Sequence, residues 1–119
     1  GVPQPDGGAG PALLSRGAFE GADAFHFGRG DALMIRDADG KHLLRLESFS
    51  VRNGPDLYVY LSCEETGARV EESLNLGRLK ATDGAFNYEI PAGIDPHAVR
   101  SVLIWCRQFG VLFAIARLS

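Results

Sequence analysis

Short runs of alternating apolar and polar residues, separated by turn signals, make up most of this chain. The runs ALMI and HLLRLESF flank RDADGK, where Asp and Gly are typical of a hairpin turn. In DLYVYLSC, an aliphatic set that begins at Leu57 and ends at Cys63 shares one face, which we expect to be buried. Both faces of the last two runs, SVLIWC and VLFAIARL, are apolar, as expected for central strands covered on both sides.

The same pattern predicts two local irregularities. Leu46 and Phe49 belong to apolar sets of opposite parity within one run, which predicts a bulge or a bend between them. Asp95 as a cap before Pro96 predicts one short helical turn. The whole pattern predicts an all-β fold, an antiparallel β-sandwich or a compact barrel of about seven to nine strands.

The chain has 119 residues, enough for one domain with a sizeable core. Residues 1–11 are rich in Gly and Pro and carry little that could anchor them, so we expect a flexible leader or tether. Residues 12–119 then form the single folded domain. The chain begins without Met, which is expected either where an upstream signal segment has been removed or where the start was chosen for expression.

Charge excludes one class of partner. Twelve Lys and Arg are scattered among fifteen acidic residues, and the net charge is -3. A nucleic-acid partner is not expected, because there is no basic stripe to hold phosphates. No apolar run reaches the ~18–20 residues of a membrane helix, so we expect no membrane span in this chain.

The two cysteines, Cys63 and Cys106, leave three alternatives open. A disulfide would close a loop of about 43 residues and stabilise the fold by roughly 4 kcal/mol. Both thiols could instead be free, and a buried free Cys then behaves as a small apolar side chain. The third alternative is that Cys106 serves a metal or haem site, for which no cofactor is required by the sequence itself.

Iron and copper sites in proteins often combine a histidine ligand with a cysteine thiolate ligand. His26 lies between two aromatic residues in FHFGRG and is the one candidate co-ligand, since we expect His42 and His97 to be surface residues. A structural, hydrogen-bonded role is the competing interpretation of His26.

Four blocks, GAFEGADAFHFGRGDALMI, LRLESFSVRNGPDLYVYLS, LGRLKATDGAFNYEIPAGID and SVLIWCRQFGVLFAIARL, occur in this order. Together they resemble the DM-thirteen domain, a family described as an electron-transfer module. The resemblance runs from about Ala12 to Leu118.

The resemblance implies an extracytoplasmic domain that is secreted, periplasmic or at the cell surface, where relatives accompany DOMON domains and cytochrome b-type membrane reductases. The family's cysteine matches Cys106, which implies a redox thiol or a haem ligand. The family's other motifs match His26 to Gly30 and Asn53 to Asp56, whereas Cys63 falls outside the pattern.

Two hypotheses follow. In the first, the chain is an extracytoplasmic electron-transfer module with Cys106 as its reactive centre, His26 and Trp105 as cofactor-binding residues, and a redox protein or membrane-associated reductase as partner. Trp105 has a competing role as a core aromatic. In the second, the chain is a non-catalytic extracellular binding or adhesive module with structural cysteines, whose function lies on loops around Phe27, Asn53 and Asp56.

Overall fold

The computed structural model describes residues 10–119 of the chain. The leader predicted for residues 1–11 falls, over residues 1–9, outside the described part. Eight strands and two 3-10 turns follow one another along the chain: β1 (Ala12–Gly21), β2 (Gly28–Arg36), β3 (His42–Val51), β4 (Leu57–Ser62), η1 (Val70–Glu72), β5 (Leu74–Arg78), β6 (Asp83–Glu89), η2 (Pro96–Ala98), β7 (Ser101–Cys106) and β8 (Val111–Arg117).

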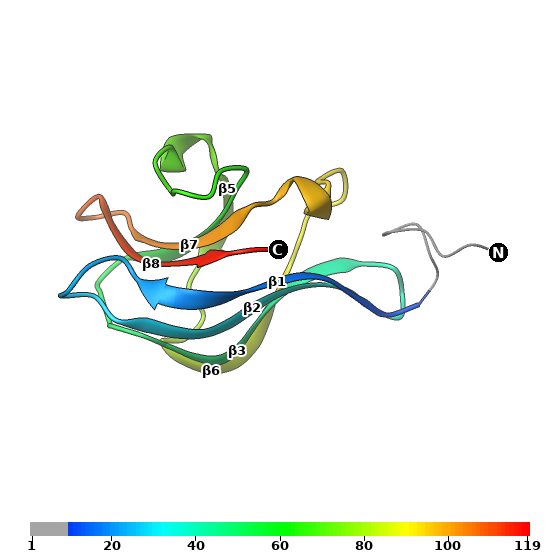
Figure 1. Cartoon of the computed structure of the whole chain (residues 1–119), viewed down its shortest axis with the longest axis horizontal. Coiled ribbons are helices and arrows are strands. Elements are labelled where there is room, and N and C mark those ends of the chain that lie inside the picture. Colours follow the sequence, from blue (N-terminus) through cyan, green and yellow to red (C-terminus); the bar gives the residue numbers. More distant parts are fainter. Residues whose placement is uncertain (1–9) are drawn as a thin grey trace.

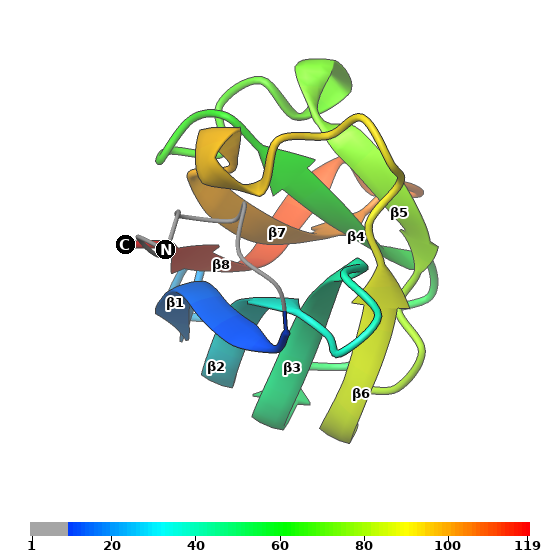
Figure 2. The ribbon, with the colours of Figure 1, turned by 90° about the vertical axis from the view of Figure 1, so that its right-hand side faces the viewer.

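The eight strands form one antiparallel sheet in the order β5-β4-β7-β8-β1-β2-β3-β6. The sheet curls into a nearly closed barrel, with the edge strands β5 and β6 on the same side of it (Figure 2). Its two layers share β1, which pairs with β2 along most of its length and with β8 near its end. The predicted all-β fold and strand number are confirmed.

The barrel is filled by side chains from every strand except β5, whose leucines pack against the same core from the edge. Central positions are fully covered by neighbouring side chains, and apolar area removed from water is the main source of stability. The largest fully buried residues of this core are Phe49, Met34, Leu44, Leu46, Ile104, Val59, Val102 and Cys106, whereas the equally buried Leu103 lies on the outer face of β7 near Gly67.

The predicted bulge is present on β3. The register of β3 against β6 shifts between Leu46 and Phe49, and Ser48 between them has a positive φ of 48°. Gly30 of β2 faces this bulge with a φ of +107°, and a Cβ there would lie 2.7 Å from the Ser48 carbonyl oxygen. Only glycine accommodates both the conformation and the close approach.

The predicted helical turn is confirmed as η2, where the Asp95 carboxylate accepts a hydrogen bond of 2.9 Å from the His97 N–H. The second turn, η1, was not predicted, and it lies in the exposed connection between β4 and β5. Neither turn is long and apolar enough to cross a membrane, and these are the only helical elements within residues 10–119.

Candidate functional site

Cys106 is the last residue of β7 and lies at one end of the barrel. Its side chain is fully buried (0% exposed) and belongs to the hydrophobic core. It pairs across the sheet with Leu57 on β4 and Val111 on β8. The next residue, Arg107, is exposed, so solvent begins one residue beyond the buried thiol.

The disulfide considered from the sequence does not form, because both cysteines are free. The ladder between β4 and β7 pairs Leu57 with Cys106 at one end and Ser62 with Ser101 at the other. Cys63 therefore lies about six residues along the strand from Cys106, roughly 20 Å away at about 3.3 Å per residue. A disulfide needs Cα atoms within about 7 Å.

The predicted inward orientation of Cys63 is also wrong. Leu57, Val59 and Leu61 are buried as expected, but Cys63 is exposed. The strand ends at Ser62, whose hydroxyl accepts a 3.0 Å hydrogen bond from the Glu64 N–H and holds the chain in a bend. Alternation of side chains stops where the strand stops.

His26 lies in the turn between β1 and β2, at the same end of the barrel as Cys106. Its ring contacts the core residue Phe113 with 4.3 Å between centroids, and its Nδ1 lies 2.7 Å from the Asp23 carboxylate. The pKa of Asp23 is lowered, chiefly because the Phe25 N–H donates to its carboxylate and also because of the His26 ring. No hydrogen bond or ring contact joins His26 to Cys106 in the described chain.

The turn from Asn53 to Asp56 is the third part of this end. The Asp56 carbonyl accepts a 3.0 Å hydrogen bond from the Arg107 N–H, which ties the turn to the residue after Cys106. The Asp56 carboxylate is 3.4 Å from Arg78 on β5. Asn53 is exposed and lines a small cavity of about 140 Å³ between this turn and the turn that follows β5.

Trp105 does not share an environment with Cys106, because neighbouring residues in a strand point to opposite faces. It is half-buried on the outside of the barrel and pairs with Tyr58 across the sheet. The guanidinium of Arg107 lies 4.6 Å from the centre of the Tyr58 ring. Arg107 thus stacks on an outer aromatic residue.

The donor set around Cys106 does not fit a metal ion or a haem. No cluster of three or more His, Cys, Asp or Glu exists among residues 10–119. The His26 Nδ1 is engaged by Asp23, and the thiol is surrounded by core hydrocarbon. Within residues 10–119, Cys106 lines none of five surface cavities, whose volumes range from about 140 to 470 Å³.

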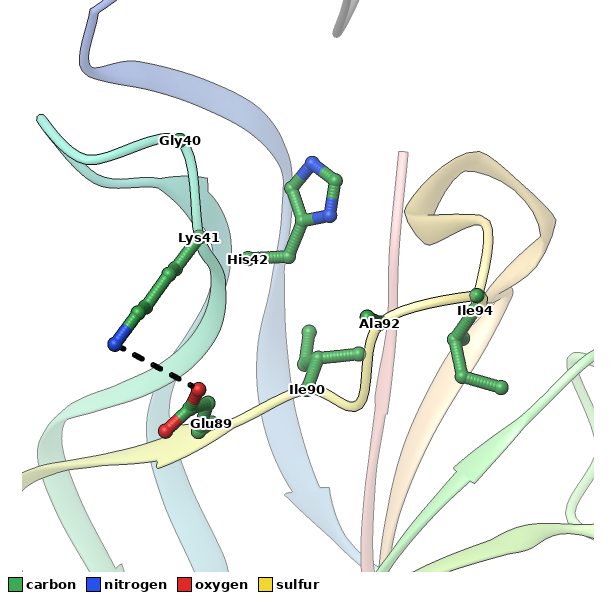
Figure 3. A pocket seen from close by; sticks show the side chains of 8 residues that line it. Gly40, Lys41, His42, Glu89, Ile90, Ala92 and Ile94 are labelled. Carbon is green, nitrogen blue, oxygen red and sulfur yellow. Dashed lines mark ion pairs between the residues drawn. The ribbon is translucent and has the colours of Figure 1, made fainter.

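The larger hollows lie at the opposite end of the barrel. One, of about 310 Å³, lies between the turn after β2 and the segment after β6, with Lys41 and Glu89 4.0 Å apart at its rim and His42 beside it (Figure 3). Another, of about 280 Å³, is lined by the exposed Cys63. The other predicted site residues, His26, Trp105, Asn53 and Asp56, line neither hollow.

The structure thus gathers Cys106, His26 and the turn from Asn53 to Asp56 at one end and leaves Trp105 on the outer face. Sequence reasoning missed Phe113, which separates His26 from the core. Alternation along β8 could not reveal that Phe113 is buried, because strict alternation would turn either Phe113 or Ala114 outward. A bulge in the ladder between β7 and β8 lets both residues join the core.

Residues 19–118 match the family described as "Electron transfer DM13". No curated protein matches this chain, and neither does any solved structure. Since the family match covers almost all of the described residues and contains Cys106, His26 and the Asn53 turn, the chain belongs to the DM13 electron-transfer family.

Proposed function

We propose that this chain is an extracytoplasmic electron-transfer domain in which Cys106 is the redox centre. The observation that supports the proposal best is the position of a free, buried thiol at the last residue of β7, one residue before the exposed Arg107 and inside the region matched by the electron-transfer family. His26 and the Asn53 turn converge on the same end.

The proposed step is a one-electron oxidation. Burying a charge without a partner is costly, so the electron and the proton of the Cys106 thiol leave together. The S–H bond breaks, the electron passes to an oxidised one-electron carrier protein, and the proton passes to water at the barrel end. An electron from a reduced carrier and a proton from water restore the thiol.

Voltammetry of the protein adsorbed on an electrode tests this proposal with a matched pair of variants. Cys106→Ala should abolish the signal, whereas Cys63→Ala, which removes the other free thiol, should keep it. The buried substitution is expected to lower stability by about 1 kcal/mol and to leave the protein folded, which circular dichroism can verify. A folded Cys106→Ala protein with the parent's signal would refute the role of Cys106.

The setting and the partner are part of the same proposal. We infer that the domain works outside the cytoplasm and exchanges electrons with a redox protein or a membrane-associated reductase, as the family resemblance implies. Fractionation of cells that express the full-length protein would test the location, and recovery in the cytoplasmic fraction would contradict it.

A non-catalytic binding module is the second candidate. The observation in its favour is that Cys106 is fully buried in the hydrophobic core and lines none of the five surface cavities described above. The voltammetry separates the two candidates, because a binding module gives no signal in the parent protein.

A further inference from the structure

Three large aromatic side chains are exposed at the end of the barrel that holds Cys106. Phe25 and Phe27 are 77% and 54% exposed in the turn after β1, and Phe109 is 60% exposed in the turn after β7. Both turns lie at the left of Figure 1. Of the large apolar residues in the described chain that are strongly exposed, only Leu13 lies elsewhere.

The turn that carries Phe25 and Phe27 is held in place by specific contacts. The Asp23 carboxylate accepts hydrogen bonds from the N–H groups of Phe25 and His26, at 2.8 and 3.0 Å. The Arg52 side chain donates to the Phe25 carbonyl at 3.0 Å, and its N–H donates to the Phe27 carbonyl at 3.1 Å. A turn whose backbone is already ordered loses little backbone entropy when its residues bind a partner.

Positive charge lies at the same end of the barrel as these rings. Arg29, Arg52 and Arg107 are exposed at this end, and none forms an ion pair with a carboxylate of residues 10–119. The nearby carboxylates are already engaged, Asp23 by the turn and Asp56 by β5. An anionic surface would therefore complement this end of an otherwise acidic protein of net charge -3.

We propose that this aromatic tip, defined by Phe25, Phe27, Phe109, Arg52 and Arg107, docks the protein that exchanges electrons with the domain. The partner would present an apolar patch ringed by carboxylates. Exposed aromatic residues and arginine without lysine form the composition that is enriched in protein interfaces. The inference rests on the proposed electron-transfer function, since electron tunnelling weakens steeply with distance and Cys106 lies beneath the tip.

A bilayer is the less favoured occupant. An anionic membrane is an extended plane that would face the acidic body of the molecule as well as the tip, whereas a protein partner can contact the tip alone. Vesicle binding is therefore one arm of the test.

The test uses two soluble haem proteins of opposite charge, an acidic b-type cytochrome and a basic c-type cytochrome, each titrated calorimetrically into the 119-residue protein. The double variant Phe27→Ala/Phe109→Ala removes two rings, and Leu13→Ala is the matched control because its exposed leucine lies elsewhere. The parent and the control should bind the acidic cytochrome, with an affinity that falls as salt rises. The double variant should bind at least about tenfold more weakly, as expected for loss of interface anchors.

Equal binding by the double variant, no binding by the parent, or a preference for the basic cytochrome would overturn the docking proposal. Binding of the parent to phosphatidylserine vesicles in place of the acidic cytochrome would also overturn it and assign the tip to a membrane. Electron exchange with an electrode needs no docked partner protein, so the double variant should keep the parent's voltammetric signal. Absence of the voltammetric signal in the parent would contradict the electron-transfer function. The cytochrome titrations would still show whether the aromatic tip binds a partner protein.

Discussion

At the scale of single residues, the two cysteines show how position along a strand decides the environment of a side chain. Cys106 closes β7 while its neighbours on β4 and β8 are still in register, so it is buried. Cys63 comes one residue after β4 ends and is exposed. The two thiols cannot substitute for each other, which makes Cys63→Ala a true control for Cys106→Ala.

Asp23 provides a pH-dependent prediction at this scale. Its pKa is lowered below the ordinary 3.8, mainly by the hydrogen bond from the Phe25 N–H. A group with a lowered pKa stabilises the folded state above its ordinary pKa, and this stabilisation is lost as pH falls through the lowered value. The turn that carries Phe25 and Phe27 should therefore stay intact at neutral pH and loosen only below pH 3.8.

The amide proton shift of Phe25, followed by NMR during an acid titration, measures this transition. Asp23→Asn should flatten the titration because the amide does not ionise. A midpoint at or above 3.8 in the parent would show that the carboxylate does not stabilise the turn.

At the scale of elements, β1 joins the two layers of the barrel. It pairs with β2 through most of its length, and Arg16 and Phe19 also contact the chain end and β8 on its other side. Between them, Gly17 packs so closely that an added Cβ would lie 2.0 Å from the Arg117 carbonyl oxygen. The glycine is what allows one strand to be shared.

Gly17→Ala should therefore destabilise the domain, by about 1–3 kcal/mol if the strands shift to accept the methyl group. Ala18→Ser is the matched control, because it adds one atom at the exposed neighbouring position and should change stability by less than about 0.5 kcal/mol. Urea unfolding monitored by Trp fluorescence would measure both. A Gly17→Ala protein as stable as the parent would mean that the layers are not joined so tightly at β1.

At the scale of the whole molecule, the barrel is completed by side chains where the backbone ladder is open. The edge strands β5 and β6 are not neighbours in the ladder. The Tyr88 hydroxyl on β6 accepts a 2.7 Å hydrogen bond from the Lys80 N–H and donates to the Arg78 carbonyl at 3.3 Å. Tyr88 is itself buried, so it both fills the core and links the two edges.

Tyr88→Phe should lower the free energy of unfolding by about 1–2 kcal/mol, because the ring stays and the hydroxyl's hydrogen bonds are lost. Tyr60→Phe, which removes a hydroxyl from a half-buried tyrosine on β4, should have little effect. Chemical denaturation of both variants gives the comparison. Equal stability of the two would rule out the link.

Burial also raises the pKa of Tyr88 above its ordinary 10.0, which opposes the effect of the Lys80 hydrogen bond. A raised pKa means that the stabilisation is complete below pH 10.0 and is lost as pH rises through the higher value. The parent should therefore lose stability in alkali more steeply than Tyr88→Phe.

Local pattern was a good guide wherever a strand had a clear alternation. The hairpin between β2 and β3, the bulge after Leu46, the turn at Pro96 and the final hairpin were all predicted from neighbouring residues. The end of β4 was not, because alternation of residue types continues through Cys63 although hydrogen bonding to β7 stops at Ser62. The limits of β1 were not predicted either, since its Gly- and Ala-containing sequence has a weak pattern.

The amino-acid sequence by itself determined the all-β class, most strands, the turns and the family, because these depend on residue types at short spacing. Only the tertiary structure decided that Cys106 and Cys63 lie far apart, that Trp105 faces away from the core and that three exposed phenylalanines lie in turns at one end of the barrel. The physical reason is that these relations depend on strand order and register between segments distant in sequence, and both are set by how the whole sheet curls to bury its apolar face.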